Sequence, residues 1–297
     1  MLSVDRAVLC TILYADVFAF PLNLDEIAHF LIHPVPLPRE LIAQRLMQSP
    51  FLRERLYMQD GYYAICERSD IVALRQAREQ IAEGMMAEAV RYGRWLAHIP
   101  FVRMVALTGA LAMRNPAHPR DDYDFFLITA PRRVWLARLC AVVLVRLARL
   151  RGVHLCPNYL LAQDDLAQAR RDLYMAHEVV QMIPLYGREY YERMLAENDW
   201  TQDFMPNAQQ RTQAYLSEVD GRLKAWLERM LAGRLGDGLE RWEQRRKQRR
   251  LTRLLSHESD ARLDSSSVKG HFVDHGQRVL AAYRERLQRY GLEDWQT

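Results

Sequence analysis

The stretch from Val105 to Thr129 constrains the fold of this chain more than any other. An apolar run ends in a turn at Gly109, and a second apolar run opens with two aspartates, Asp122 and Asp124. Residues two apart in an extended strand point to the same face, so both carboxylates are expected to converge beside the glycine turn. Such a pair suits a divalent metal that carries a nucleotide phosphate.

This pattern resembles the nucleotidyltransferase superfamily of the DNA polymerase β type. In that family an apolar strand leads to Gly followed by Gly or Ser, and Asp-hydrophobe-Asp opens the next strand. Here eleven residues separate Gly109-Ala110 from Asp122-Tyr123-Asp124. The resemblance covers about a quarter of the chain and implies a small mixed sheet flanked by helices.

The resemblance also implies a function for individual residues. Asp122 and Asp124 are expected to be catalytic and to hold Mg²⁺ as the cofactor. The main chain at 108–110, with Thr108, Gly109 and Ala110, is expected to bind a nucleoside triphosphate, ATP being the expected one. Arg114, in the loop after the glycine turn, is the preferred side chain for a phosphate contact. The acceptor, a small molecule or a protein, is left unnamed by the sequence.

The chain departs from the family pattern at two places. Ala110 stands where the family has a small hydroxyl or glycine residue, so a hydroxyl contact to phosphate is absent. The family also carries a third carboxylate on a later strand, but the matching segment, residues 152–161, has no acid. Asn158 is the best occupant of that catalytic place, although it cannot act as a base. The titratable alternatives are His154 within the segment and the pair Asp164 and Asp165 beyond it.

These departures leave two functions open. The first is an enzyme that transfers a nucleotidyl group from the triphosphate to the acceptor. The second is a catalytically degenerate protein that binds nucleotide or serves as a scaffold, and that regulates a protein or DNA partner through its N-terminal domain.

The whole chain is predicted to be an α+β protein that is mostly helical. Residues 1–68 are expected to form a winged-helix-like domain, since three short helical segments precede a hairpin that turns at Asp60-Gly61. A helix over residues 69–100 is expected to connect it to a nucleotidyltransferase-like αβ core at residues 101–163. Residues 164–297 are expected to be almost wholly helical.

Local signals add detail to these parts. Asn23 followed by Glu26 predicts a capping box, and Ser69 is expected to cap the connecting helix. His177 and Gln181 share one face of a later helix, where packing beneath the sheet is expected and lining of the nucleotide pocket is the alternative. DNA binding is not favoured, because the candidate recognition helix offers only Arg39, Gln44 and Arg45 as polar readers.

Composition excludes several classes of protein. The net charge of +4 does not by itself indicate nucleic acid, and most of the excess lies in the run from Arg241 to Arg253. A solvated helix face is the simpler interpretation of that run, and a site for polyanions is the alternative. Four widely spaced cysteines indicate reduced residues of a cytoplasmic protein, and no signal peptide is recognised. Arginines interrupt the apolar segment from Val134 to Leu150, so a buried helix is expected and no membrane association.

Overall fold

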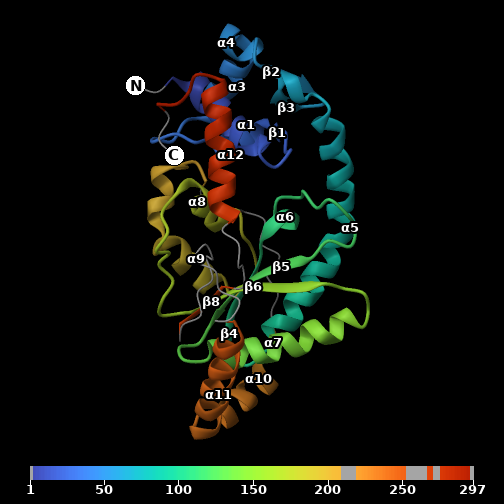
Figure 1. The fold of residues 1–297 in the computed structure, drawn as a ribbon, viewed down its shortest axis with the longest axis vertical. Coiled ribbons are helices and arrows are strands. Elements are labelled where there is room, and N and C mark those ends of the chain that lie inside the picture. Colours follow the sequence, from blue (N-terminus) through green and yellow to red (C-terminus); the bar gives the residue numbers. More distant parts are fainter. Residues whose placement is uncertain (1–2, 209–218, 252–265, 270–274, 295–297) are drawn as a thin grey trace.

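The computed structural model describes residues 3–208, 219–251, 266–269 and 275–294. The described part is an α+β fold in which helices predominate, as expected. The N-terminal elements lie at one end of the molecule and a mixed sheet occupies its middle, with the long helix α5 (Ile71–Ala97) running between them (Figure 1).

The N-terminal part combines helices with a small sheet. Its described strands form a three-stranded antiparallel sheet in the order β1-β3-β2. The elements are α1 (Val4–Asp16), β1 (Leu22–Asn23), α2 (Leu24–His29), α3 (Arg39–Gln48), α4 (Pro50–Arg53), β2 (Leu56–Gln59), β3 (Tyr62–Ile65) and a short 3₁₀ helix, Cys66–Arg68.

Local sequence signals account for several of these boundaries. The predicted capping box is present, because the Asn23 side chain accepts from the Glu26 N–H while the Glu26 carboxylate accepts from the Asn23 N–H. The hairpin turns at Asp60 and Gly61, both of which have positive φ. Ser69 does not cap α5. Asp70 precedes the helix instead, and its side chain makes no capping bond.

The central sheet has the strand order β7-β4-β5-β6-β8 within the described residues. Only β5 and β6 are parallel, and every other neighbouring pair is antiparallel. The strands are β4 (Val102–Leu107), β5 (Tyr123–Thr129), β6 (Leu155–Ala162), β7 (Ile183–Tyr186) and β8 (Ser267–Lys269).

Alternation along the central strands divides the core into two layers. Phe125 and Leu127 face α5 and α7 (Val134–Arg149), whereas Phe126 and Ile128 face α1, α8 (Leu173–Val180) and α12 (His275–Arg289). Alternate residues of a strand point to opposite faces, so one strand supplies both layers. The N-terminal part therefore packs on one face of the central sheet, and α5 and α7 pack on the other face.

The expectation of an almost wholly helical C-terminal region is wrong at β7 and β8, which complete the two edges of the central sheet. Both segments are short, and their pairing with β4 and β6 is determined by contacts distant in sequence. The remaining helices of the region are α9 (Arg188–Ala196), the 3₁₀ segment Asp199–Asp203, α10 (Gly221–Leu231) and α11 (Arg234–Leu251). Among the described helices, none combines the length and apolar character that crossing a bilayer requires.

Candidate active site

A cavity of about 520 Å³ lies between the central sheet and the N-terminal helices. Its floor contains Thr108, which follows β4, Gly109 and Ala110 at the start of the short helix α6 (Gly109–Ala112), Asp124 from β5 and Asn158 from β6. Side chains of α1, α8 and α12 complete its walls, and these helices lie on the side of the sheet where α6 follows β4 (Figure 1). Most of the predicted site residues therefore meet in one cavity.

The glycine turn packs directly on one of the two aspartates. Gly109 has φ +66°, a conformation that side-chain-bearing residues rarely adopt, and a Cβ placed on it would collide with the Asp124 carboxylate. The Thr108 N–H donates to the Asp124 carbonyl at 2.9 Å, which holds the turn against the start of β5. Glycine is thus required here both by the backbone conformation and by the close approach.

Replacing Gly109 with alanine is expected to lower the free energy of unfolding by about 1–3 kcal/mol through backbone strain alone, and to displace Asp124 as well. Gly152→Ala is the matched control. Gly152 also has positive φ, +74°, but a Cβ there would meet nothing within 4 Å. Urea unfolding compares the two variants, and equal losses would show that the contact between Gly109 and Asp124 has no effect on stability.

The pKa of Asp124 is raised from 3.8 to about 6, chiefly by burial and also by the negative charges of Asp122 and Asp121. Hydrogen bonding by Asn158 and by Cys156 opposes this shift. The Asn158 Nδ2–H donates to Asp124 Oδ1 at 2.6 Å and favours the ionised form. A partly buried carboxylate with a raised pKa is a group that gains from a nearby cation.

A β-bulge aims Asn158 at the carboxylate. Phe125 pairs with Pro157 and Phe126 with Tyr159, so Asn158 is the extra residue on β6. Bulges next to functional sites commonly redirect one side chain in this way. The predicted occupant of the third position does therefore contact Asp124, as a hydrogen-bond donor and not as a base.

Cys156 orders the Asn158 amide. Its thiol donates to Asn158 Oδ1 at 2.6 Å, which leaves Nδ2 to face Asp124. Burial raises the pKa of this thiol to about 12, so it remains a thiol at neutral pH. The structure thus places Cys156, one of the four cysteines expected to be reduced, beside the site. Its spacing of two residues from Asn158 along a strand is the signal that could have indicated this place.

Asp122 lies outside the cavity, although its charge acts on Asp124. Its side chain is 57% exposed, and its Oδ1 lies 3.4 Å from His154 Nδ1. The neighbouring Asp121 accepts from the main-chain N–H groups of Ala117 and His118, which organises the preceding loop. Within the described ranges, no group of three or more His, Cys, Asp or Glu side chains is placed to hold a metal ion.

The cavity wall opposite the sheet is aromatic. The rings of Tyr14 and His177 stack with centroids 4.0 Å apart, and Phe30 stacks with His177 at a centroid distance of 5.9 Å. Burial lowers the pKa of His177 to about 4, so its imidazole is neutral at physiological pH. The Tyr14 hydroxyl is buried and has no hydrogen-bond partner in the described structure. No local sequence signal pointed to Tyr14, because it reaches the site from α1.

His177 and Gln181 both line the cavity, and each is also hydrogen-bonded within the protein. His177 Nδ1 bonds the Leu173 carbonyl at 2.9 Å, and Gln181 Nε2–H donates to Glu178 at 2.9 Å. The two alternatives that the sequence left open for this pair, packing and pocket lining, are thus combined.

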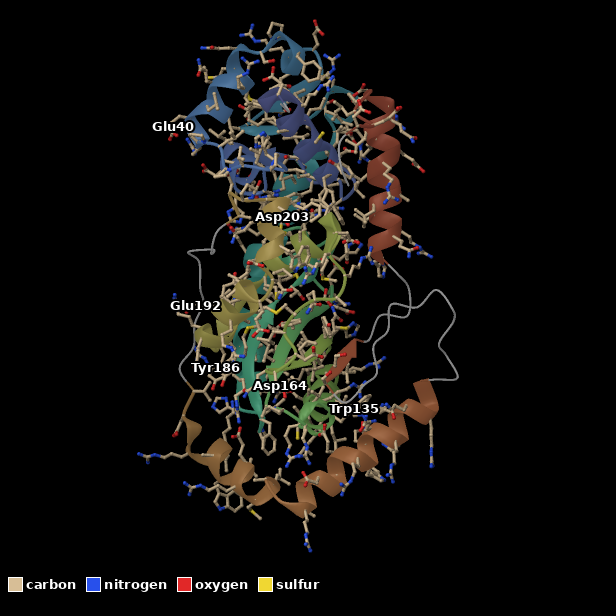
Figure 2. The ribbon with its side chains drawn as sticks, turned by 90° about the vertical axis from the view of Figure 1, so that its left-hand side faces the viewer. Glu40, Trp135, Asp164, Tyr186, Glu192 and Asp203 are labelled. Carbon is tan, nitrogen blue, oxygen red and sulfur yellow. The ribbon has the colours of Figure 1, made fainter. Side chains whose placement is uncertain are left out.

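The remaining sequence candidates do not line the cavity. Arg114 forms an ion pair with Glu83 of α5 at 2.9 Å. Asp164 is exposed and follows the C-terminal end of β6 (Figure 2), and Asp165 accepts from the Ser266 hydroxyl at 2.6 Å. Among the described lining residues there is also no lysine or arginine, so charge on a bound phosphate has no cationic side chain beside it in the cavity.

Comparison of the chain with family models, with curated proteins and with solved structures found no match. The geometry and electrostatics of the cavity are therefore the basis on which its chemistry is assigned.

Proposed function

We propose that this protein binds a magnesium–nucleoside triphosphate complex, with ATP as the expected nucleotide, and transfers its nucleotidyl group to a small-molecule or protein acceptor. The observation that carries this proposal is the packing of Gly109 on the partly buried carboxylate of Asp124 at the floor of the cavity. Because Gly109 has no side chain, its main chain can approach phosphate oxygens next to the Asp124 carboxylate.

The residues present fit a magnesium ion by their donor chemistry. Asp124 would supply a carboxylate oxygen of the kind that Mg²⁺ prefers, Asp122 would supply a second on turning from His154 toward the cavity, and the remaining coordination positions would suit water and phosphate. When bound, the ion neutralises charge on phosphate oxygens and stabilises the leaving group. A cation here also offsets the burial of Asp124, the main cause of its raised pKa.

The residues around Asp124 act by positioning. The Asn158 Nδ2–H donates to Asp124 Oδ1 and fixes the carboxylate, and the Cys156 thiol fixes the orientation of Asn158. The apolar body of the cavity, which includes Phe126 and Met182, suits the uncharged part of the nucleotide or acceptor and excludes water from the reacting groups.

The test is thermal unfolding of the full chain titrated with ATP, with and without Mg²⁺. Stabilisation of about 2.7 kcal/mol is expected at a nucleotide concentration roughly 100 times Kd, and only in the presence of the metal. Asp124→Asn should abolish the shift and Asp122→Asn should weaken it. Asp164→Asn, which removes an exposed carboxylate outside the cavity, is the control and should behave as the native chain. No shift with any nucleotide would exclude the proposal.

A second candidate, nucleotide binding without catalysis, is favoured by one observation. The place of the third carboxylate holds Asn158, whose amide is committed to Asp124. Pyrophosphate release distinguishes the two, since transfer releases it and binding alone does not.

The N-terminal part supports a structural or protein-docking role more than DNA binding. Its order of helices, hairpin and three-stranded sheet is consistent with a winged helix. Both arginines of the candidate recognition helix α3 are already paired, Arg39 with Asp25 at 2.5 Å and Arg45 with Asp5 at 2.5 Å. Such pairs leave little charge for DNA phosphates.

A further inference from the structure

Helices α10 and α11 form the end of the molecule farthest from α1 and α12 (Figures 1 and 2). Their solvent side, called here the outer face, consists of the exposed residues of Gly221–Leu231 and Arg234–Leu251. Residues 241–251 of the basic run noted in the sequence belong to α11, while its last two residues, 252 and 253, lie outside the described residues.

All four acidic residues of α10 and α11 bind inward. Glu228 accepts from the Phe101 N–H and pairs with Arg103, and Asp237 pairs with Arg133 at 2.8 Å. Glu240 and Glu243 are buried. Glu240 accepts from the Trp135 and Leu136 N–H groups in the first turn of α7. Glu243 lies 3.7 Å from Arg138 and also pairs with Arg246 of α11 itself. The inward attachment of these acids removes negative charge from the outer face.

The arginines of the two helices are distributed in the opposite way. Six of them are exposed and make no ion pair with any described residue: Arg222, Arg229, Arg234, Arg241, Arg245 and Arg249. The outer face thus presents unneutralised positive charge. Its partner must supply negative charge to complement it.

Large apolar side chains share the outer face with these arginines. Leu223, Trp226 and Met230 follow one another at helical spacing on α10, and Leu235 and Trp242 do so on α11. Each of the five is more than half exposed. An apolar stripe of this kind on a helix that packs its other side inward is available to a partner with apolar groups.

We propose that the outer face of α10 and α11 docks on the surface of an anionic lipid bilayer. Arginine attracted to anionic headgroups, combined with tryptophan and aliphatic side chains that enter the headgroup and acyl boundary, is the chemistry of interfacial helices. Three of the five apolar residues are aliphatic, which favours lipid over nucleic acid, because bases stack on aromatic rings. The proposal is independent of the function assigned to the cavity.

The test is co-sedimentation of the full chain with vesicles of phosphatidylcholine alone, or of phosphatidylcholine and phosphatidylglycerol in equal parts. Binding is expected only to the anionic vesicles and should weaken with added salt. Arg234→Gln/Arg241→Gln/Arg245→Gln should reduce partitioning roughly a hundredfold, the factor that about 1 kcal/mol for each arginine gives. Trp226→Ser/Trp242→Ser should also reduce binding while leaving the melting temperature unchanged.

The matched control removes the same charge from the opposite end of the molecule. Arg278→Gln/Arg284→Gln/Arg289→Gln changes three exposed arginines of α12 and should retain vesicle binding. An equal loss in both triple variants would overturn the proposal, as would tighter binding to duplex DNA or single-stranded RNA than to anionic vesicles. Conversion of a dimer to a monomer by the tryptophan variant would identify the face as a self-interface and would overturn it as well.

Discussion

Replacing Arg75 with methionine is expected to lower the free energy of unfolding by about 3–5 kcal/mol. Arg75 is 1% exposed and pairs with Glu26 of α2 at 2.8 Å and with Glu79 of α5 at 2.7 Å. Its guanidinium carbon also lies 3.8 Å from the centre of the Phe20 ring. Methionine preserves much of the packing volume but leaves two carboxylates without their shared cation, so the loss is mainly electrostatic.

The control for this prediction lies on the same helix. Arg91 pairs with Glu88 three residues before it, and its side chain is 56% exposed, so Arg91→Met should change stability by about 1 kcal/mol or less. Urea unfolding measures both variants. Glu79→Gln should recover part of the loss in the Arg75→Met background, because it removes one of the unpaired charges. Equal losses of unfolding free energy in the two methionine variants would show that the ion pairs of Arg75 do not stabilise the contact between the N-terminal part and α5.

The elements that were predictable from sequence are those whose signals are local. Two such signals are the capping box at Asn23 and Glu26 and the turn at Asp60-Gly61. Each involves residues no more than three positions apart in the sequence, and both are present. The strands β7 and β8 had no such signal. They are short segments whose partners, β4 and β6, are distant in sequence, so tertiary pairing determines their conformation.

The candidate site divides in the same manner. The spacing of Gly109, Asp122 and Asp124 indicated the turn and the carboxylates, but it did not show that Asp122 remains exposed outside the cavity while Asp124 lines it. That difference arises because Asp122 precedes β5, whereas Asp124 lies within it. Tyr14 was not predictable, since only the packing of α1 over the sheet brings its hydroxyl to the site.

Asp124→Asn is expected to stabilise the protein by about 2–3 kcal/mol near pH 7 in the absence of divalent cations. The pKa of Asp124 is about 6 in the folded chain against an ordinary value of 3.8, so the folded state binds more protons than the unfolded state between these values. Stability of the native chain therefore falls as pH rises through this window, and each pKa unit corresponds to about 1.4 kcal/mol. Asparagine does not ionise and still accepts the Asn158 hydrogen bond.

The stabilisation should vanish only below about pH 3, where Asp124 of the native chain is protonated in both the folded and the unfolded state. His177 acts in the opposite direction, because its pKa of about 4 makes the folded state bind fewer protons than the unfolded state as pH falls below 6.5. The contribution of His177 to stability is the same in the native chain and in Asp124→Asn, so it cancels in the difference between their free energies of unfolding. Urea unfolding at several pH values should thus give a difference that grows from pH 4 to pH 7.

The response of stability to Mg²⁺ then shows whether Asp124 is only a destabilising, partly buried charge or is also part of a metal site. If Asp124 helps to hold the ion, added Mg²⁺ should stabilise the native chain near pH 7 and leave Asp124→Asn unchanged, which narrows the gap between them. Asp122→Asn removes an exposed carboxylate whose charge raises the pKa of Asp124, so it should show a smaller stabilisation and a reduced response to the metal. If the difference in free energy of unfolding between the native chain and Asp124→Asn did not depend on pH, the Asp124 carboxylate would not be desolvated at the cavity floor. If added Mg²⁺ left that difference unchanged, the ion would not neutralise the charge of Asp124.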